Sequence, residues 1–223
     1  MAEQIPFGAV EFAANPEQRC PCVLLLDTSA SMAGERLSEL QNGIAQLKTE
    51  LSGDLLAKKR VELAIVTFGG HVHLAADFAT VDAFEVPHLR ADGLTPMGEA
   101  IQLGLELVRT RKNVYRHNGI AYYRPWIFLI TDGEPNDTWL AAAKAVREAE
   151  AARQLAFFAV GVAQANFDVL QQISVRQPLA LKGVMFHEMF QWLSSSLKSV
   201  SHSSVGDELP LENPAIPTGW AKV

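Results

Sequence analysis

The chain has 223 residues, of which 48% are hydrophobic and 20% charged, with a formal net charge of -6 and a pI of about 5.5. This length suits one α/β domain that buries about 70% of its unfolded surface. The acidic balance offers no generally basic face for a phosphate backbone, so general nucleic-acid binding is not expected. The longest apolar runs are strand-sized, well short of the roughly 20 residues that cross a bilayer, and no membrane span is predicted.

The N-terminal sequence and the two cysteines predict a reducing compartment. The opening MAEQIPFG has neither the basic nor the apolar segment of an export signal, so we expect a cytoplasmic protein. Cys20 and Cys22 are separated by a single proline, which opposes a disulfide between them. We interpret Cys22 as a small buried residue that opens a strand, with a thiolate metal site or redox pair as the alternative. Both thiols should therefore stay reduced.

Apolar runs and amphipathic stretches alternate from the first cysteines onward. CVLLLD at 22–27 is continuously apolar, which is typical of a parallel strand covered on both faces. Apolar residues between 37 and 51 then recur at steps of three and four, which predicts a helix. Further strands are expected at 61–70, 126–130, 155–163 and 178–183, and further helices at 97–111, 139–149, 166–173 and 186–200.

The glycine pair at 69–70 predicts a tight turn into HVHLAADF at 71–78, which we interpret as an antiparallel edge strand. The alternation as a whole predicts an α/β, Rossmann-like fold, with a mostly parallel central sheet, one antiparallel edge strand and helices on both faces. The predicted organisation is an N-terminal extension at 1–16, one domain at 17–200 and a tail at 201–223.

The tail contains Pro210 and Pro217, among other prolines, which oppose a regular helix and remove donors from a sheet. It is interpreted either as a poorly ordered terminus or a strap on its own domain, or as a segment that binds a partner. In the second case Leu209, Ile216 and Trp220 would be the anchors. The sequence leaves both interpretations open.

Three oxygen-rich loops carry the candidate chemistry. Asp27 and Asp132 follow the two most apolar strands, at the carboxyl ends where open α/β sheets bind ligands. In DTSAS, the alternate spacing of Ser29 and Ser31 allows both hydroxyls to face one small object, and a third loop supplies Thr95 ahead of a helix. Oxygen ligands of this kind suit a hard cation such as Mg²⁺.

Each loop alone has a simpler interpretation. Serine and threonine before a helix usually cap its free N–H groups, and Thr95, Pro96 and Glu99 resemble a capping arrangement. The TDG sequence at 131–133 is an ordinary turn. Their occurrence together in one α/β pattern favours a metal site.

DTSAS, the later TP loop and ITDG, in that order, resemble the von Willebrand factor A (VWA) domain with its metal-ion-dependent adhesion site (MIDAS). The similarity covers roughly Pro16 to Val200. It implies that the top of the sheet binds Mg²⁺ or Mn²⁺, with the threonine and acids as ligands either directly or through water. It also implies a protein-interaction module, in which an Asp or Glu of a protein partner completes the metal shell. The implied ligands are Asp27, Ser29, Ser31, Thr95 and Asp132.

More narrowly, RCPCVLLLDTSASM, GLTPMGEAI and FLITDGEPND resemble the bacterial TerY-like proteins of tellurite resistance. That resemblance implies a role in a bacterial stress response. It also implies partners among kinase, phosphatase or other tellurite-resistance components. No residue of the chain identifies the partner.

An enzyme is the rival interpretation, because LLLD and FLITDGEPND also resemble the nucleophile strand and the acidic metal loop of haloacid-dehalogenase-like phosphatases. Those enzymes place a second Asp two residues after the nucleophile as general acid and base, where this chain has Ser29. GxSxG and GxxxxGK[ST] motifs are absent from the sequence. We therefore predict that the chain is not an enzyme, and a structural VWA domain without functional metal is the remaining alternative.

Other polar residues have simpler explanations. His71 and His73 alternate on the predicted edge strand and resemble a Zn²⁺ or Ni²⁺ pair, but a solvent-facing polar row is favoured. The basic run at 109–118 is interpreted as a solvated helix end. The polar residues at 134–137 either tune partner choice at the rim or cap the helix that begins near Trp139.

Overall fold

The computed structural model describes residues 12–207, 211, 213–214 and 219–222, and within them the chain forms a sheet with the strand order β3-β2-β1-β4-β5-β6-β7. Strands β1, β2, β4, β5 and β6 are parallel, and β3 and β7 are antiparallel at the two edges. The strands are β1 (Cys20–Asp27), β2 (Val61–Gly69), β3 (His71–Thr80), β4 (Trp126–Thr131), β5 (Ala156–Gly161), β6 (Leu179–Leu181) and β7 (Ala221–Lys222).

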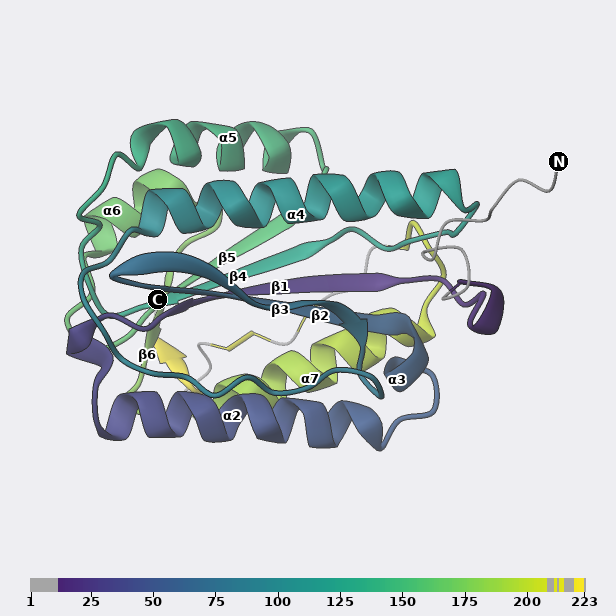
Figure 1. Cartoon of the computed structure of the whole chain (residues 1–223), viewed down its shortest axis with the longest axis horizontal. Helices are drawn as coiled ribbons and strands as arrows, with labels where there is room; N and C mark the ends of the chain where they lie inside the picture. The colour runs from purple at the N-terminus through teal and green to yellow at the C-terminus, as the bar shows by residue number, and fades with distance from the viewer. Residues whose placement is uncertain (1–11, 208–210, 212, 215–218, 223) are drawn as a thin grey trace, which may run out of the picture.

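Helices cover both faces of this sheet, with α4, α5 and α6 on one face and α2, α3 and α7 on the other (Figure 1). Alternate residues of β1 point to opposite faces, so Leu24 joins the core under α2 and α7 while Leu25 joins the core under α4 and α5. The expected fold class is confirmed. The helical elements are η1 (Ala30–Met32), α2 (Glu35–Ser52), α3 (Ala57–Arg60), α4 (Met97–His117), α5 (Leu140–Ala151), α6 (Phe167–Ile173) and α7 (Phe186–His202).

The second antiparallel edge, β7, was not expected from the sequence. Its two residues, Ala221 and Lys222, are not prolines, so both have the backbone N–H that pairing with β6 needs. Trp220 is buried and packs edge-to-face on Trp192 of α7, with ring centroids 5.8 Å apart. The end of the tail is therefore a strap on its own domain, and Trp220 is not a free anchor for a partner. Leu209 and Ile216 lie outside the described residues.

The buried carboxylate of Glu62, near the amino end of β2, binds several polar side chains. Glu62 of β2 and Arg19 both have fully buried side chains, and Arg19 Nε donates to Glu62 Oε1 at 2.8 Å. Arg111 of α4 binds both oxygens of Glu62 at 2.8 Å, and the Tyr115 hydroxyl also donates to this carboxylate. Arg111 and Tyr115 belong to the basic run at 109–118, so the interpretation of that run as a solvated helix end is wrong for these two residues.

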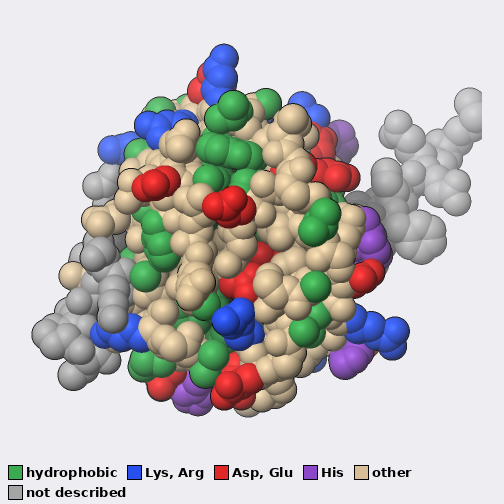
Figure 2. Space-filling view, turned by 90° about the vertical axis from the view of Figure 1, so that its left-hand side faces the viewer, with side chains coloured by type: hydrophobic (Ala, Val, Ile, Leu, Met, Phe, Trp, Pro, Cys, Tyr) green, Lys and Arg blue, Asp and Glu red, His purple; other side chains and the backbone are tan. Residues whose placement is uncertain are grey.

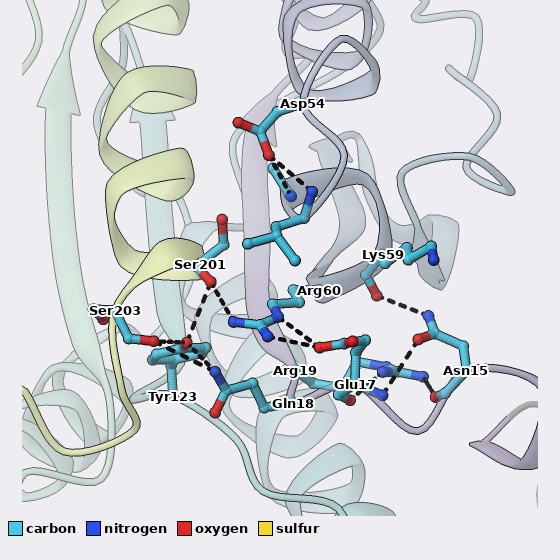
Figure 3. Close-up of polar contacts among 12 residues, drawn as sticks. Asn15, Glu17, Gln18, Arg19, Asp54, Lys59, Arg60, Tyr123, Ser201 and Ser203 are labelled. Atoms are coloured by element: carbon cyan, nitrogen blue, oxygen red, sulfur yellow. Dashed lines mark hydrogen bonds and ion pairs between the residues drawn. The ribbon is translucent and has the colours of Figure 1, made fainter.

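A second polar cluster, near the amino ends of β1 and β2, joins the segment before β1 to the end of α7 (Figure 3). Arg60 forms an ion pair with Glu17 at 2.7 Å and donates to the carbonyl oxygen of Ser201 at 2.7 Å. The hydroxyl of Tyr123 donates to the carbonyl oxygen of Ser203 at 2.6 Å. The segment before β1 and the segment after α7 thus contact the same body, and the domain limits at 17 and 200 stay a prediction.

The two cysteines lie on β1 with Pro21 between them, and both are buried and free of disulfides. Burial, together with the negative charge of Glu62, raises the pKa of Cys20 to about 12, and burial also raises the pKa of Cys22. The buried hydrophobic interpretation of Cys22 is confirmed. Because the thiolate is the reactive form, the native protein should not react with a thiol reagent at pH 8. Colour release from a disulfide reagent should appear only after denaturant is added, and immediate reaction of the native thiols would contradict this.

No helix in the described part of the chain is long and apolar enough to cross a membrane.

Candidate metal centre

Three loops meet at the carboxyl ends of the parallel strands, which point to the left-hand end of the molecule in Figure 1. Asp27 ends β1 and Asp132 follows β4, and these two strands are neighbours in the sheet. The loop that carries Thr95 is tied to the first loop by backbone hydrogen bonds, from Asp92 N to Thr28 O at 2.8 Å and from Ala30 N to Gly93 O at 3.0 Å. Figure 2 looks onto this end, where acidic side chains lie near the middle of the face with a basic side chain beside them.

Asp27 is completely buried, and both of its carboxylate oxygens accept hydrogen bonds. Oδ1 accepts from the backbone N–H of Ser29 at 2.8 Å, and Oδ2 accepts from the hydroxyl of Thr131 at 2.6 Å. Burial raises the pKa of Asp27, the hydrogen bonds from Ser29 and Thr131 oppose the increase, and the nearby charge of Asp132 adds to it. The two acids are therefore close enough to repel, and a cation between them would relieve that repulsion.

A chain of hydrogen bonds joins the two acidic loops. The hydroxyl oxygens of Ser29 and Ser31 are 3.0 Å apart, and the Ser31 hydroxyl donates to Asp132 Oδ1 at 2.7 Å. Ser29 and Asp132 are buried, whereas Ser31 is exposed at the rim. Four of the five predicted ligands, Asp27 included, thus lie in one continuous set of contacts.

Thr95, the fifth, approaches from the side of Gly133. A Cβ atom placed on Gly133 would lie 3.3 Å from Thr95 Oγ1 and 3.8 Å from Asp27 Oδ2, so the missing side chain leaves space beside both oxygens. Within the described part of the chain, the Thr95 hydroxyl makes no hydrogen bond. A donor set of two carboxylates and three hydroxyls fits a hard divalent cation.

The simpler interpretation of Thr95 alone, as a cap of the following helix, is wrong. Helix α4 begins after Pro96 without a side-chain cap from its own loop. Its first N–H groups are bound instead by Asp137, which accepts from Gly98 N at 3.0 Å and from Glu99 N at 2.8 Å. Asp137 therefore caps α4 and not the helix near Trp139. This contact fixes the loop after Asp132 against α4 and leaves the Thr95 hydroxyl available.

Two residues that contact the site were not found from the sequence. Thr131 orients Asp27, and Arg36 of α2 donates to Asp132 Oδ2 at 2.8 Å and to Ser31 O at 3.0 Å. Thr131 is the last residue of β4 and directly precedes Asp132, so strand alternation is a signal that could have placed it on the side of Asp27. Arg36 has no comparable signal, because its partner lies 96 residues away in sequence.

The two histidines of the edge strand do not join this centre. His71 and His73 are both exposed on β3, as a solvent-facing polar row would be. Among the described residues, no three or more His, Cys, Asp or Glu side chains are grouped to hold a metal ion. The candidate centre thus combines three hydroxyl groups with two carboxylates.

Comparison with known proteins agrees with this architecture. Residues 22–187 match the family model of the von Willebrand factor type A domain. The pilus adhesin SpaC of Lactobacillus rhamnosus GG superposes with a TM-score of 0.66 at 12% identity, over 82% of this chain and 31% of that chain. The vWF domain of the type V pili tip protein Mfa5 of Porphyromonas gingivalis gives a TM-score of 0.62 at 11% identity, over 84% and 98% of the two chains.

Proximal thread matrix protein 1 of the mussel byssus, solved with a zinc-occupied MIDAS motif, gives a TM-score of 0.52 at 18% identity, over 83% of this chain. The chain spans 48% of the length of that byssus protein. These identities show a common fold alone, and no curated protein has significant sequence similarity to the chain. Since the family model covers most of the sequence, the chain belongs to the von Willebrand factor type A domain family.

Proposed function

We propose that this chain is a metal-dependent protein-interaction module with a MIDAS-type site. In this proposal Mg²⁺ or Mn²⁺ is held by Asp27, Ser29, Ser31, Thr95 and Asp132. The observation that carries it is the contact between separate loops, in which the Ser31 hydroxyl lies 2.7 Å from Asp132 and 3.0 Å from the hydroxyl of Ser29. The zinc-occupied MIDAS of the byssus protein supports a divalent metal in this fold.

When bound, the metal would supply a positive charge at the face, which attracts an Asp or Glu of a protein partner. The residues of the chain have the task of holding that charge in place. Thr131 and the backbone of Ser29 fix both oxygens of Asp27. Asp137 holds the loop of Asp132 against the start of α4.

A phosphatase is the less favoured function. Ser29 stands where the second Asp of a haloacid-dehalogenase-like enzyme would act as acid and base, and a hydroxyl does not do this at neutral pH. We therefore propose a non-enzymatic role, and Mg²⁺-dependent release of phosphate from p-nitrophenyl phosphate that is lost in Asp27→Asn would contradict it.

If the metal site binds a partner, Thr95→Ala should weaken partner binding more than it lowers the stability of the fold. The Thr95 hydroxyl makes no hydrogen bond within the described residues, so its loss should leave the thermal midpoint almost unchanged. Proteins captured from the native host in Mg²⁺ should be lost in EDTA and captured less by Thr95→Ala. If the same proteins bind equally in EDTA and to Thr95→Ala, the metal-bridging mechanism is wrong.

Replacement of Arg36 should strengthen metal binding, in contrast to replacement of a metal ligand. Its guanidinium neutralises Asp132 at 2.8 Å and thus competes with a cation for this carboxylate. Arg36→Gln should raise the affinity for Mn²⁺ about tenfold, because one opposing charge is removed from a partly buried site. Arg109→Gln is the matched control, since Arg109 is exposed and, among the described residues, forms its ion pair with the helix neighbour Glu106. Calorimetric titration of both variants tests this, and an unchanged or weaker Arg36→Gln affinity would contradict it.

The residues that flank the motifs support a finer hypothesis, a TerY-like role in bacterial tellurite resistance, with kinase, phosphatase or other components of that system as partners. A cytoplasmic location belongs to the same hypothesis. Deletion of the gene in its host should lower the tellurite concentration that stops growth, and restoration by the wild type but not by Asp27→Asn would link that role to the metal site. Equal tellurite tolerance of the deletion strain would remove the hypothesis and leave the metal-dependent module intact.

A further inference from the structure

A pocket of about 560 Å³ lies beside the metal centre, between the edge strand β3 and the loop that follows it. Its walls include His71 and His73 of β3 and the loop at 87–92. Thr28, which stands between two of the predicted metal ligands, lines the same pocket. Asp92 N donates to Thr28 O at 2.8 Å, so the outer wall is bound to the loop that carries those ligands. The pocket therefore adjoins the candidate metal centre.

The outer wall of the pocket is held in place by helix α2. The side chain of Gln41 donates from Nε2 to Pro87 O at 3.0 Å, and its Oε1 accepts from Leu89 N at 2.8 Å. Leu89 is itself buried in the core on this side of the sheet. The protein alone thus forms the pocket, as is usual for binding sites.

The side chains that line the pocket have polar groups without partners. They include the imidazoles of His71, His73 and His88 and the guanidinium of Arg90. All four residues are exposed, and within the described part of the chain their side chains make no hydrogen bond or ion pair. Asp92 is the acid among the described lining residues, and it too forms no ion pair with them. These groups are therefore available to a molecule that enters the pocket.

The charge of the pocket depends on pH, because imidazole is the side chain that ordinarily changes charge between about pH 5 and 8. When the three histidines are neutral, Arg90 and Asp92 balance each other. When the histidines are protonated, four cations line the pocket with one carboxylate. Among the described residues, neither β2 nor α2, which pack on either side, adds a charged side chain to its lining. The pocket should thus attract anionic groups more strongly as the pH falls.

We propose that this pocket binds an acidic stretch of the partner polypeptide, next to the Asp or Glu that reaches the metal. The inference rests on the proposed function, because the metal-bound carboxylate places the partner beside the pocket. The carboxylates of the stretch pair with Arg90 and with the protonated histidines through charge-assisted hydrogen bonds. The partner is thus recognised by a run of acidic residues, and its binding strengthens in mild acid.

Titration of the full chain with fluorescein-labelled octaglutamate tests the proposal, with fluorescence anisotropy as the measurement. In saturating Mg²⁺ and at constant ionic strength, the peptide should bind at least about tenfold more tightly at pH 6 than at pH 8. The reason is that up to three positive charges are added close to the peptide.

The triple variant His71→Gln, His73→Gln, His88→Gln should bind octaglutamate equally at the two pH values. His117→Gln is the matched control, because it removes an exposed imidazole from the other end of α4 and should keep the pH dependence of the wild type.

Arg90→Gln should weaken binding at both pH values. Arg109→Gln, which removes the same charge from the exposed face of α4, should bind like the wild type. Thermal unfolding checks that each variant is folded, which we expect because all the substituted side chains are exposed.

The proposal is overturned if the triple variant keeps the pH dependence of the wild type, or if Arg90→Gln and Arg109→Gln bind equally. It is also overturned if the wild type does not bind at millimolar octaglutamate at pH 6. In each case the proposed metal function is judged separately, by whether Mn²⁺ binds the wild type and not Asp27→Asn. Octaglutamate binding that depends on the three histidines but is unchanged in EDTA and in Asp27→Asn would support the pocket and contradict the metal function.

Discussion

Replacement of Asp27 by Asn is expected to lower the affinity for Mn²⁺ at least about 100-fold, since loss of an outer-shell partner alone costs about 10- to 100-fold in metal sites. Asp27 is the most buried of the predicted ligands and supplies one of only two negative charges. Calorimetric titration measures the effect. Asp77→Asn removes the same charge from the exposed face of β3 and should bind Mn²⁺ like the wild type. Equal Mn²⁺ binding by wild type and Asp27→Asn would show that the site is elsewhere.

The same variant should keep its fold. Asn has nearly the volume of Asp and retains an oxygen that accepts from Ser29 N or from the Thr131 hydroxyl. Because burial raises the pKa of Asp27, its favourable contribution to stability is present at low pH and is lost as the pH rises through the folded-state pKa. At neutral pH the buried charge is therefore a cost in the absence of metal. In EDTA, Asp27→Asn should unfold at the same temperature as the wild type or higher, and only the wild type should gain stability from Mn²⁺.

Glu62→Ala should give the largest loss of stability, about 3–5 kcal/mol in the free energy of unfolding, which is typical when one partner of a buried ion pair is removed. Glu62 and Arg19 are both fully buried, so the substitution leaves the guanidinium of Arg19 without a carboxylate, and Arg111 and Tyr115 lose the same partner. Urea denaturation measures the difference.

The matched control for Glu62 is Glu106→Ala, which removes a carboxylate from an exposed pair with Arg109 on α4. Its midpoint should not change measurably, because such surface pairs contribute little. A Glu62→Ala protein with the urea midpoint of the wild type would mean that the buried cluster does not stabilise the fold.

The central fold could be predicted from the sequence because its strands are buried on both faces and read as continuous apolar runs. The end of α4 could not be predicted in the same way. Arg111 and Tyr115 have polar side chains in a basic stretch. Their contacts inside the fold are with Glu62, which lies about 50 residues earlier on β2. Strand β7 consists of two residues after a tail with several separate prolines, and the packing of Trp220 on Trp192 comes from tertiary contact.

In the candidate site too, some residues could be placed from the sequence and others could not. Positions at the carboxyl ends of β1 and β4 follow from strand order, so Asp27 and Asp132 could be placed near each other from the sequence. Arg36 could not, because its contact with Asp132 depends on how α2 packs beside the sheet. The cap of α4 shows the same limit. Local sequence favours Thr95, but Asp137 from a distant loop takes the role.

The most direct test of the metal-dependent account is anomalous diffraction from crystals of the protein grown or soaked in Mn²⁺. The account predicts a manganese peak at the carboxyl end of the sheet, among the oxygens of Asp27, Ser29, Ser31, Thr95 and Asp132, and no such peak in crystals of Asp27→Asn. A wild-type crystal with no peak at this position, or with its manganese on other residues, would contradict the account.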